Sequence, residues 1–451
     1  MQQTKTSRRR FLQGAAATVG AALIVPSRVW SADTKPNDKI VMGFIGMGKQ
    51  NRGLLGGFLG HENVRVIAVC DVDTNRRDGA KATVDKKYGN NDCKAVNDFR
   101  EITEDPAIDA VCIATPDHWH AITSISAVTH GKDVYCEKPL THNIHEALAV
   151  TEASRKNKRV FQTGSMQRSM AEFRVAAELV RNGVIGKVSR VDTSFGDPAV
   201  PNHNPEESME PGLDWDRWCG PGPLAPYSSV LSPRGIHDHF PLWRMAREYG
   251  GGMICDWGAH HIDAAQWALG MDENGPVEVV PPADWESPHA RGAQLIYADG
   301  VVLTHVDGRG VSIFGSDGEV HVNRGKFELV LKGVSKHRFW DEDKDKDKHK
   351  DKETTLQKEL TATEKEYLAD AKVHLYKSTN QIRDFLDCVA SRQKPICDVG
   401  IGASSAIACH LMNFAYYHGA KIKWDPTAHK FISGGEDKWL TREYRGQWTV
   451  A

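Results

Sequence analysis

The chain has little net charge, no paired-cysteine motif and no apparent internal repeat. Its 451 residues carry a formal net charge of −2, so no basic surface for nucleic acid or an anionic membrane is expected. None of the nine cysteines lies in a Cys-x-x-Cys pair, which argues against a zinc or disulfide framework. Hydrophobic content of 40% and charged content of 26% are those of a soluble globular protein. The length predicts two or three domains.

Long hydrophobic runs are also scarce, and the one near the start is too short for a comfortable transmembrane helix. This run, Gly14–Val25, follows Ser7-Arg8-Arg9-Arg10-Phe11-Leu12-Gln13. Paired arginines before an apolar stretch and small residues predict a twin-arginine signal peptide over residues 1–32. We therefore expect the twin-arginine export machinery to deliver the folded protein to the periplasm. That route suits a protein that acquires a cytosolic cofactor before export.

Short apolar runs alternate with helical patterns through the first third of the mature chain. Runs of this kind indicate buried parallel strands, and the alternation predicts an α/β fold with a doubly wound sheet. The expected strands are Lys39–Ile45, Val64–Cys70, Asp109–Ala114, Asp133–Cys136 and Val160–Thr163.

A glycine turn follows the first of these strands. Gly46-Met47-Gly48 would permit a tight turn and a close approach of the backbone to a pyrophosphate. Asn51 stands where a third glycine is usual, and Gly53 is expected to supply the close helix packing instead. The segment Gly46–Asn51 is therefore predicted to bind a dinucleotide.

Asp71 ends the second strand, about 25 residues after Gly46, near the usual spacing of a ribose-binding acid. A carboxylate there accepts from the ribose 2′-hydroxyl and repels a 2′-phosphate, so NAD is favoured over NADP. Arg76 and Arg77 lie close enough in sequence to leave NADP open.

The segment Val134–Pro139 reads as a buried strand that ends in a carboxylate, an ammonium and a proline. Lys138 is thus presented at the carboxyl end of a parallel strand, where open α/β sheets hold their ligands. An ammonium beside a cationic cofactor, away from water, can have its pKa lowered enough to act as a base. A surface Glu137–Lys138 pair before a turn is the alternative.

Asp256 and His260 lie four residues apart at the start of a predicted helix that runs to Leu269. On one helical face they would form a usable acid/base pair. The alternative is a helix cap with an interior histidine. Several other histidines could hold zinc, but no His-Glu-x-x-His motif exists, so no metal is expected.

The rest of the chain predicts a second domain. Short strands between residues 293 and 331, separated by turns such as Asp299-Gly300, indicate an open, largely antiparallel sheet. Residues 341–353 alternate Asp and Lys and are expected to form a charged surface insertion. Helices are expected at Ser378–Ser391 and Gly402–His418, and a C-terminal tail at 426–451.

These motifs together resemble the Gfo/Idh/MocA family of oxidoreductases. The resemblance rests on Gly46 and Gly48, on Ala114-Thr115-Pro116 with His120, on Glu137-Lys138-Pro139, and on Asp-x-Gly-x-His-x-x-Asp from Asp256. It implies an α/β fold with a Rossmann domain at 36–160 and a substrate or oligomerisation domain at 161–425 that holds a large, mainly antiparallel open sheet.

The resemblance also implies roles for particular residues. Lys138, Asp256 and His260 would be catalytic, and Asp263 would support them. The cofactor would be NAD, and the chain would form a homo-oligomer. Residues expected at the cofactor are Gly46, Met47, Gly48, Asn51, Asp71, Thr115, Pro116, His120, Glu137 and Lys138; those expected at the substrate are Gln167, Arg168, Trp215, Trp218 and His261.

Three functions are compatible with this sequence. The leading one is an NAD-dependent oxidoreductase acting on a secondary hydroxyl of a sugar, an inositol-like polyol or a glycoside. The second is a glycosidase that uses NAD transiently, through oxidation, elimination, water addition and reduction. The third, a non-catalytic sugar-binding protein, is disfavoured by the presence of Lys138, Asp256 and His260 together.

Overall fold

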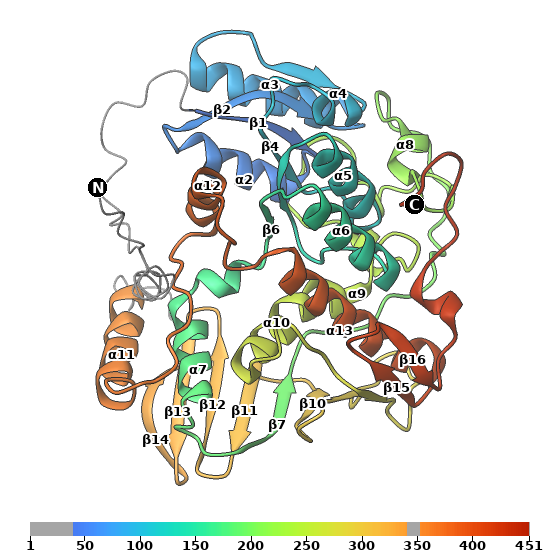
Figure 1. The fold of residues 1–451 in the computed structure, drawn as a ribbon. Coiled ribbons are helices and arrows are strands. Elements are labelled where there is room, and N and C mark those ends of the chain that lie inside the picture. The colour runs from blue at the N-terminus through green and yellow to red at the C-terminus, as the bar shows by residue number, and fades with distance from the viewer. Residues whose placement is uncertain (1–38, 341–351, 451) are drawn as a thin grey trace, which may run out of the picture. The chain divides into compact units, whose positions relative to one another are not determined.

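The structure is a computed structural model that describes residues 39–340 and 352–450. Two sheets carry the fold (Figure 1). The predicted signal peptide (1–32) lies outside the described residues, as does most of the charged segment 341–353. No helix in the described ranges is long and apolar enough to cross a membrane.

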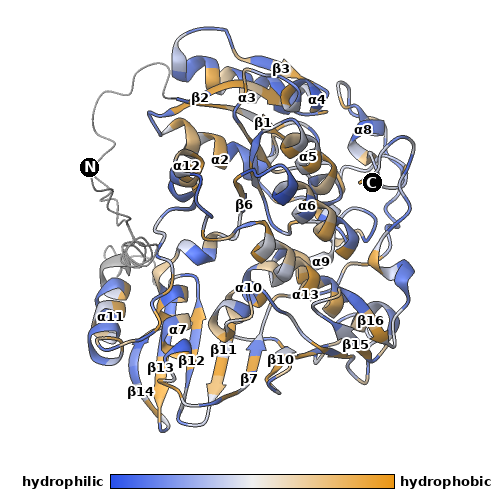
Figure 2. Cartoon of the chain, viewed as in Figure 1, coloured by the Kyte–Doolittle hydropathy of each residue, from blue (hydrophilic) through white to orange (hydrophobic). Residues whose placement is uncertain are grey.

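The first sheet is parallel and doubly wound, as predicted. Its strand order is β3-β2-β1-β4-β5-β6, and all neighbours are parallel. The order of the strands along the chain changes direction between β1 and β4, and such sheets bind ligands at this switch point. Hydrophobic residues run along β1 and β2 (Figure 2), because both faces of the sheet are covered. The strands are β1 (Ile40–Ile45), β2 (Val64–Cys70), β3 (Lys94–Val96), β4 (Ala110–Ile113), β5 (Asp133–Cys136) and β6 (Phe161–Thr163).

Helices connect these strands and cover the sheet. A helix from the far end of the chain, α12 (Gln381–Ser391), joins them, and its Phe385 packs edge-on against Phe58 and Tyr135. The first domain therefore includes a helix from much later in the chain. A hydrogen bond from Gln162 to the Gln381 carbonyl joins residues that are 219 positions apart. The connecting helices are α2 (Lys49–Leu59), α3 (Thr74–Tyr88), α4 (Arg100–Thr103), α5 (Asp117–Thr129) and α6 (Ile144–Lys156).

The second sheet has ten strands in the order β14-β13-β12-β11-β7-β10-β9-β8-β15-β16. Neighbours are antiparallel except β7 and β10, which are parallel. β6 extends the first sheet past the predicted boundary at residue 160, and β16 places part of the predicted tail in the second sheet. The strands are β7 (Val188–Thr193), β8 (Glu278–Val280), β9 (Gln294–Ile296), β10 (Val302–His305), β11 (Val311–Gly315), β12 (Gly318–Asn323), β13 (Lys326–Leu331), β14 (Val334–Phe339), β15 (Ile422–Asp425) and β16 (Lys430–Ser433).

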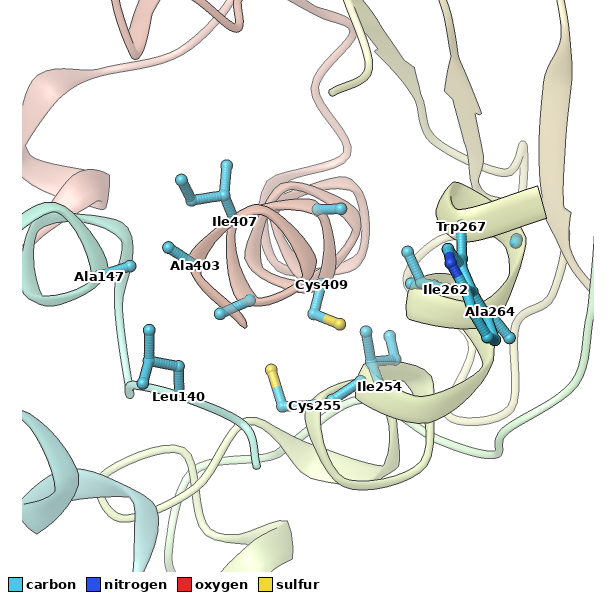
Figure 3. Packing of buried hydrophobic residues seen from close by; sticks show 14 of the residues in the cluster. Leu140, Ala147, Ile254, Cys255, Ile262, Ala264, Trp267, Ala403, Ile407 and Cys409 are labelled. Atoms are coloured by element: carbon cyan, nitrogen blue, oxygen red, sulfur yellow. The ribbon is translucent and has the colours of Figure 1, made fainter. Parts of the chain in front are cut away.

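One long helix, α13 (Val399–His418), packs against both domains. Figure 3 shows Ala403 and Ile407 of α13 near Ala147 of α6, while Cys409 faces Cys255 of the second domain. This shared core fixes the two domains against each other. The other helices of the second domain are α7 (Ala171–Arg181), α9 (Gly252–Asp256), α10 (Gly258–Leu269) and α11 (Lys352–Tyr367).

The predicted helix from Asp256 to Leu269 is in fact two helices. α9 ends at Asp256, Trp257 separates it from α10, and the amides of His260 and His261 both donate to the Trp257 carbonyl. The Asp256 carbonyl instead accepts from the Lys138 Nζ at 2.8 Å. In a continuous helix the Asp256 carbonyl would accept from the His260 amide. Here it accepts from Lys138 of the first domain instead.

A long connection between β7 and α9, residues 194–251, folds back onto the first domain. It contains α8 (Trp215–Cys219), and Leu213 forms an isolated bridge with Asp73 next to α3. Aromatic residues give this β7–α9 connection a core of its own, which includes Trp215, Trp218, Tyr227, Trp243 and Tyr249.

The end of the chain also returns to the first domain. Arg442 donates to the His118 carbonyl at 2.7 Å and forms an ion pair with Glu146. Trp448 packs edge-on against Trp119, with ring centroids 4.8 Å apart. The tail is therefore part of the wall around the sheet's carboxyl edge.

Candidate active site

One cavity follows the carboxyl edge of the first sheet and opens toward α9 and α10. It encloses about 1640 Å³ of empty space, its mouth included. Its walls come from the glycine turn, the ends of β4 and β5, the β7–α9 connection, α9, α10 and the β12–β13 turn; among the lining residues are Gly46, Asp71, Thr115, Lys138, Trp218, Asp256, His260 and Arg324.

The glycine turn has the shape that a dinucleotide needs. Gly46 has φ +80°, and a Cβ there would lie 2.8 Å from the backbone nitrogen of Thr115. A Cβ on Gly48 would meet no atom within 4 Å, so the cavity directly faces the backbone where α2 begins. The open cradle and the free amides of the helix terminus fit a pyrophosphate.

Asn51 and Gly53 have different roles from those expected. Asn51 is fully buried, donates to the Ile45 carbonyl at 3.0 Å and accepts from the Cys112 thiol, so it supports the turn from beneath and does not line the cavity. A Cβ on Gly53 would meet no atom within 4 Å, so this glycine provides no close packing.

Asp71 lines the cavity and also fixes the turn. Its carboxylate accepts from the Met47 amide at 2.6 Å and from the Asp73 amide at 2.9 Å. Burial raises the pKa of Asp71, while the positive charge of Arg76 opposes that shift. Arg76 itself donates to the Pro233 carbonyl at 2.5 Å and to Ser232. Its guanidinium is therefore committed to the β7–α9 connection, which fits NAD better than a 2′-phosphate.

Thr115, Pro116 and His120 line the cavity beside the glycine turn. The His120 ring bridges two loops, with Nδ1 2.8 Å from the Pro139 carbonyl oxygen and Nε2 3.0 Å from that of Thr115. Burial lowers the pKa of His120 to about 4. Its ring therefore connects the β4 and β5 turns while one edge faces the cavity.

Glu137 is buried at the end of β5. It accepts from Gln50 Nε2 at 3.0 Å, and burial raises its pKa against the opposing charge of Lys138. A Cβ on Gly164 would lie 2.7 Å from its Oε1. The carboxylate thus has a fixed position that requires glycine in the neighbouring strand turn.

Lys138 and Asp256 form an ion pair across the two domains. Lys138 Nζ lies 2.5 Å from Asp256 Oδ1, and Arg244 Nε lies 3.5 Å from the same oxygen. Burial acts to raise the pKa of Asp256, but the charges of Lys138 and Arg244 outweigh it, so the pKa lies below its ordinary value. The Asp256 carboxylate is therefore charged and holds two cations at the cavity wall.

His260 lies in the first turn of α10 and lines the cavity near Lys138. Burial, followed by the charges of Lys138 and Arg324, holds its pKa well below the usual range. Within residues 39–340 and 352–450, no side chain or backbone group bonds its Nδ1. The predicted Asp256–His260 pair is replaced by Asp256–Lys138, because α9 ends before α10 begins.

Several residues predicted at the substrate lie away from the cavity. Arg168 is 2% exposed and forms ion pairs with Asp263 and Asp272, which places it in the core of the second domain. Trp215 donates to the Ala225 carbonyl and stacks on Trp218, which does reach the cavity. Two further residues predicted at the substrate, Gln167 and His261, also do not line the cavity.

Gln167 and His261 are nevertheless connected to the cavity wall. The Gln167 amide, in the orientation that satisfies both partners, donates to the His260 carbonyl at 3.0 Å and accepts from Arg324 Nε at 3.2 Å. His261 Nδ1 lies 2.7 Å from the Ser194 carbonyl oxygen. Both residues fix the position of α10 rather than facing the cleft.

Sequence reasoning missed several charged or aromatic residues of the wall, among them Asp117, Arg244, Trp257 and Arg324. Asp117 is the first residue of α5, and burial raises its pKa to about 7 against the opposing charge of Arg244. Arg244, Trp257 and Arg324 also line the cavity. Asp117 carried a signal, since it directly follows the Thr-Pro turn. Arg244 lies in a short 3-10 helix (Leu242–Met245) and Arg324 in a hairpin turn, and neither belongs to a motif.

The first domain has a parallel sheet with a glycine turn, and a cleft containing an ion pair separates it from a second α/β domain. These features define a two-domain dinucleotide-binding protein. The model "Oxidoreductase family, NAD-binding Rossmann fold" matches residues 40–165, and "Oxidoreductase family, C-terminal alpha/beta domain" matches residues 187–324. The chain belongs to this Gfo/Idh/MocA oxidoreductase family.

Curated relatives match only part of their own length. An inositol 2-dehydrogenase of Rhodococcus jostii (strain RHA1) is 33% identical over 110 residues, which cover 24% of this chain and 30% of the relative. A myo-inositol 2-dehydrogenase of Thermotoga maritima is 30% identical over 162 residues, covering 36% and 46%. The matched region thus covers less than half the length of each of these relatives.

A solved structure shows the same fold over most of the chain. The aldose-aldose oxidoreductase from Caulobacter crescentus, complexed with glycerol, has a TM-score of 0.57 and 19% identity, and the match covers 85% of this chain and 99% of that one. At this level of identity the likeness concerns the fold alone.

Proposed function

We propose that the chain is an NAD-dependent oxidoreductase that moves a hydride between the nicotinamide and a secondary hydroxyl of a sugar, polyol or glycoside. The observation that carries this proposal is the continuous cavity, which contains the glycine turn with Asp71 at its walls and also Lys138, Asp256 and His260. The matched regions of inositol dehydrogenases support the substrate class.

The cofactor site fits NAD through groups of this chain. The backbone at Gly46 and Gly48, with the amides where α2 begins, would hold the pyrophosphate. Asp71 retains lone pairs beyond its two amide contacts and would accept from the ribose. Bound NAD⁺ would supply the hydride acceptor.

The chain's own residues would manage the proton and the developing charge. Lys138, held by Asp256, can donate to the substrate oxygen and stabilise negative charge on it. His260, a neutral imidazole in the same wall, can accept the hydroxyl proton. This division gives His260 the role of base and Lys138 that of electrostatic stabiliser, with Asp256 as the group that positions the lysine.

The proposal is tested with the purified mature protein. We expect NAD(H) to be released on denaturation or NAD to bind on titration, and a screen of sugars, polyols and glycosides to show NADH absorbance with at least one of them. Absence of both cofactor binding and NADH formation would favour a sugar-binding protein that does no redox chemistry.

A second candidate, an NAD-assisted glycoside hydrolase, is favoured by one observation. Side chains of α2 and α3 donate to carbonyls of the β7–α9 connection: Lys49 to Asp238 at 2.5 Å, Arg52 to His237 at 2.6 Å and Arg76 to Pro233 at 2.5 Å. These bonds hold the connection over the dinucleotide end of the cavity, which suits a cofactor that is retained and reoxidised in place.

The two candidates differ in their products. A hydrolase would cleave a glycoside without accumulating NADH. The hydrogen next to the oxidised carbon would exchange with solvent, because elimination removes it as a proton. A dehydrogenase would instead form NADH in proportion to oxidised substrate. Product analysis with a labelled glycoside therefore separates them.

We also propose that the protein is exported by the twin-arginine route to the periplasm. Arg8-Arg9 before the apolar run Gly14–Val25 support this proposal. The residues concerned lie outside those that the structure describes.

A further inference from the structure

Arg324 is a half-buried cation that has no counter-ion among the residues that the structure describes. It lies in the turn between β12 and β13 and lines the cavity with Trp257 and His260. In the part of the chain that the structure describes, no carboxylate lies within ion-pair distance of its guanidinium, and its one hydrogen bond joins Nε to Gln167 at 3.2 Å. Within those residues its two terminal nitrogens make no hydrogen bond, and the residue lines the cavity.

The neighbouring charges do not neutralise Arg324. Asp256 is shared by Lys138 and Arg244, at 2.5 and 3.5 Å. Burial lowers the pKa of Arg324, and the more distant charges of Asp256 and Glu137 oppose that shift without removing it. Buried cations are normally paired with an anion, and none of the described residues supplies one to this guanidinium.

Two further carboxyls at this end of the cavity, Asp117 and Glu137, form no ion pair with Arg324 within the described residues. Burial raises the pKa of Asp117 to about 7 and also raises the pKa of Glu137. Within the described residues, Lys138 and Arg244 thus share the Asp256 carboxylate, while Arg324 is paired with none. Oxidised nicotinamide would add a further positive charge, so the cofactor's reactive ring does not resolve the imbalance.

We propose that the substrate of this cleft carries an acidic group, a carboxylate or a phosphate, and that Arg324 binds it. This inference rests on the proposed function, because it names the substrate class of the same site. A guanidinium presents two parallel N–H donors that match the oxygens of a carboxylate or phosphate. The guanidinium carbon of Arg324 lies 4.5 Å from the centre of the Trp257 ring, and this cation–π contact supports one face of the guanidinium.

The same contacts would orient the substrate for reaction. Gln167 joins Arg324 Nε to the His260 carbonyl, so the guanidinium and the imidazole have a fixed relative position. An acidic sugar anchored at Arg324 would present a nearby hydroxyl to His260 and Lys138. A neutral sugar would lack this anchor and leave the guanidinium unpaired.

The test compares ligands that differ only in the acidic group. Binding to the full mature protein is measured by calorimetry with D-glucuronate, D-galacturonate and D-mannuronate, with the parent hexoses and with their 6-phosphates, at one ionic strength. A hydrogen-bonded charge pair changes affinity by about 10- to 100-fold. We expect at least one acidic sugar to bind about 10-fold or more tightly than its neutral parent.

Two variants assign that preference to Arg324. Arg324→Gln should reduce acidic-sugar affinity to the level of the parent hexose, and Arg324→Lys should restore part of it. The matched control is Arg309→Gln, because Arg309 also packs over a tryptophan, Trp340, but pairs with Glu328 and does not line the cavity. That control should retain the wild-type preference.

The outcomes separate the inference from the proposed function. Tighter binding of the phosphates than of the uronates would identify the acidic group as phosphate. Equal binding of acidic and neutral sugars, no binding of any acidic sugar, or a preference unchanged in Arg324→Gln would overturn the inference. NAD titration of the same samples tests the proposed function independently, since Arg324 lies outside the glycine turn.

Discussion

Lys138 Nζ and Asp256 Oδ1, 118 residues apart in the chain, lie 2.5 Å from each other across the two domains. Both side chains are largely buried, with 14% and 19% of their surface exposed. An ion pair in such surroundings holds both groups in place only while both partners remain. The reacting end of the cavity therefore depends on correct docking of the second domain onto the first.

Replacing Lys138 with Met should remove the cation that stabilises the reacting oxygen while keeping the length of the side chain. We expect the rate of the chemical step to fall by about 100- to 10,000-fold. Binding of NAD should persist, because the glycine turn and Asp71 are unchanged. Single-turnover kinetics and cofactor titration measure the two effects separately.

The control for this variant is Lys94→Met. Lys94 pairs with Asp105 at an exposed position, so its loss should leave the rate nearly unchanged. A near-normal rate in Lys138→Met would show that the site is wrongly assigned.

Asp117 should make stability depend on pH. Burial raises its pKa in the folded state to about 7, above the ordinary value of 3.8, so the folded protein binds a proton that the unfolded chain has released. The contribution of Asp117 to the unfolding free energy is therefore fully present below about pH 4 and is lost as the pH rises toward 7. The slope is at most about 1.4 kcal/mol per pH unit.

The variant Asp117→Asn isolates this contribution, because the amide oxygen can still accept from the Gly251 amide. The difference in unfolding free energy, wild type minus variant, should decrease from pH 4 to pH 7 in denaturant titrations. A difference that stays constant over this range would mean that Asp117 is ionised throughout.

Much of the first domain could be predicted from local patterns. The apolar runs and the proline after Lys138 determine where β5 ends, and this places the ammonium at the ligand-binding edge. The glycine turn was found in the same way, since Gly46 adopts a φ that other residues avoid. These features depend on residues close together in sequence.

The substrate end could not be predicted because it depends on distant contacts. The break at Trp257 follows from the bond between Lys138 and the Asp256 carbonyl, which helix periodicity does not reveal. The family resemblance placed Arg168 at the cleft, yet its ion pairs with Asp263 and Asp272 hold it in the core. Arg324 lies in an ordinary hairpin turn, and only the packed structure brings it to His260.

Export should depend on the first two arginines of the leader. Replacing Arg8 and Arg9 together with Lys should leave unprocessed protein in the cytoplasm of an expressing bacterium, because the twin-arginine machinery reads that pair. Cell fractionation and the mass of the product measure the effect. Arg10→Lys is the matched control and should be exported normally; periplasmic delivery of the double variant would argue against this route.

Gly164 should tolerate no side chain, because Glu137 occupies the space. A Cβ on Gly164 would lie 2.7 Å from Glu137 Oε1 and 2.8 Å from its Cδ, so Gly164→Ala must displace a buried carboxylate next to Lys138. We expect a loss of about 1–3 kcal/mol in unfolding free energy and a slower chemical step. Gly53→Ala in α2 is the control: its Cβ would meet no atom within 4 Å, and it should stabilise the protein by about 0.5–1 kcal/mol. Thermal unfolding and turnover of both variants test this contrast, and equal stability of the two would contradict the fixed position of Glu137.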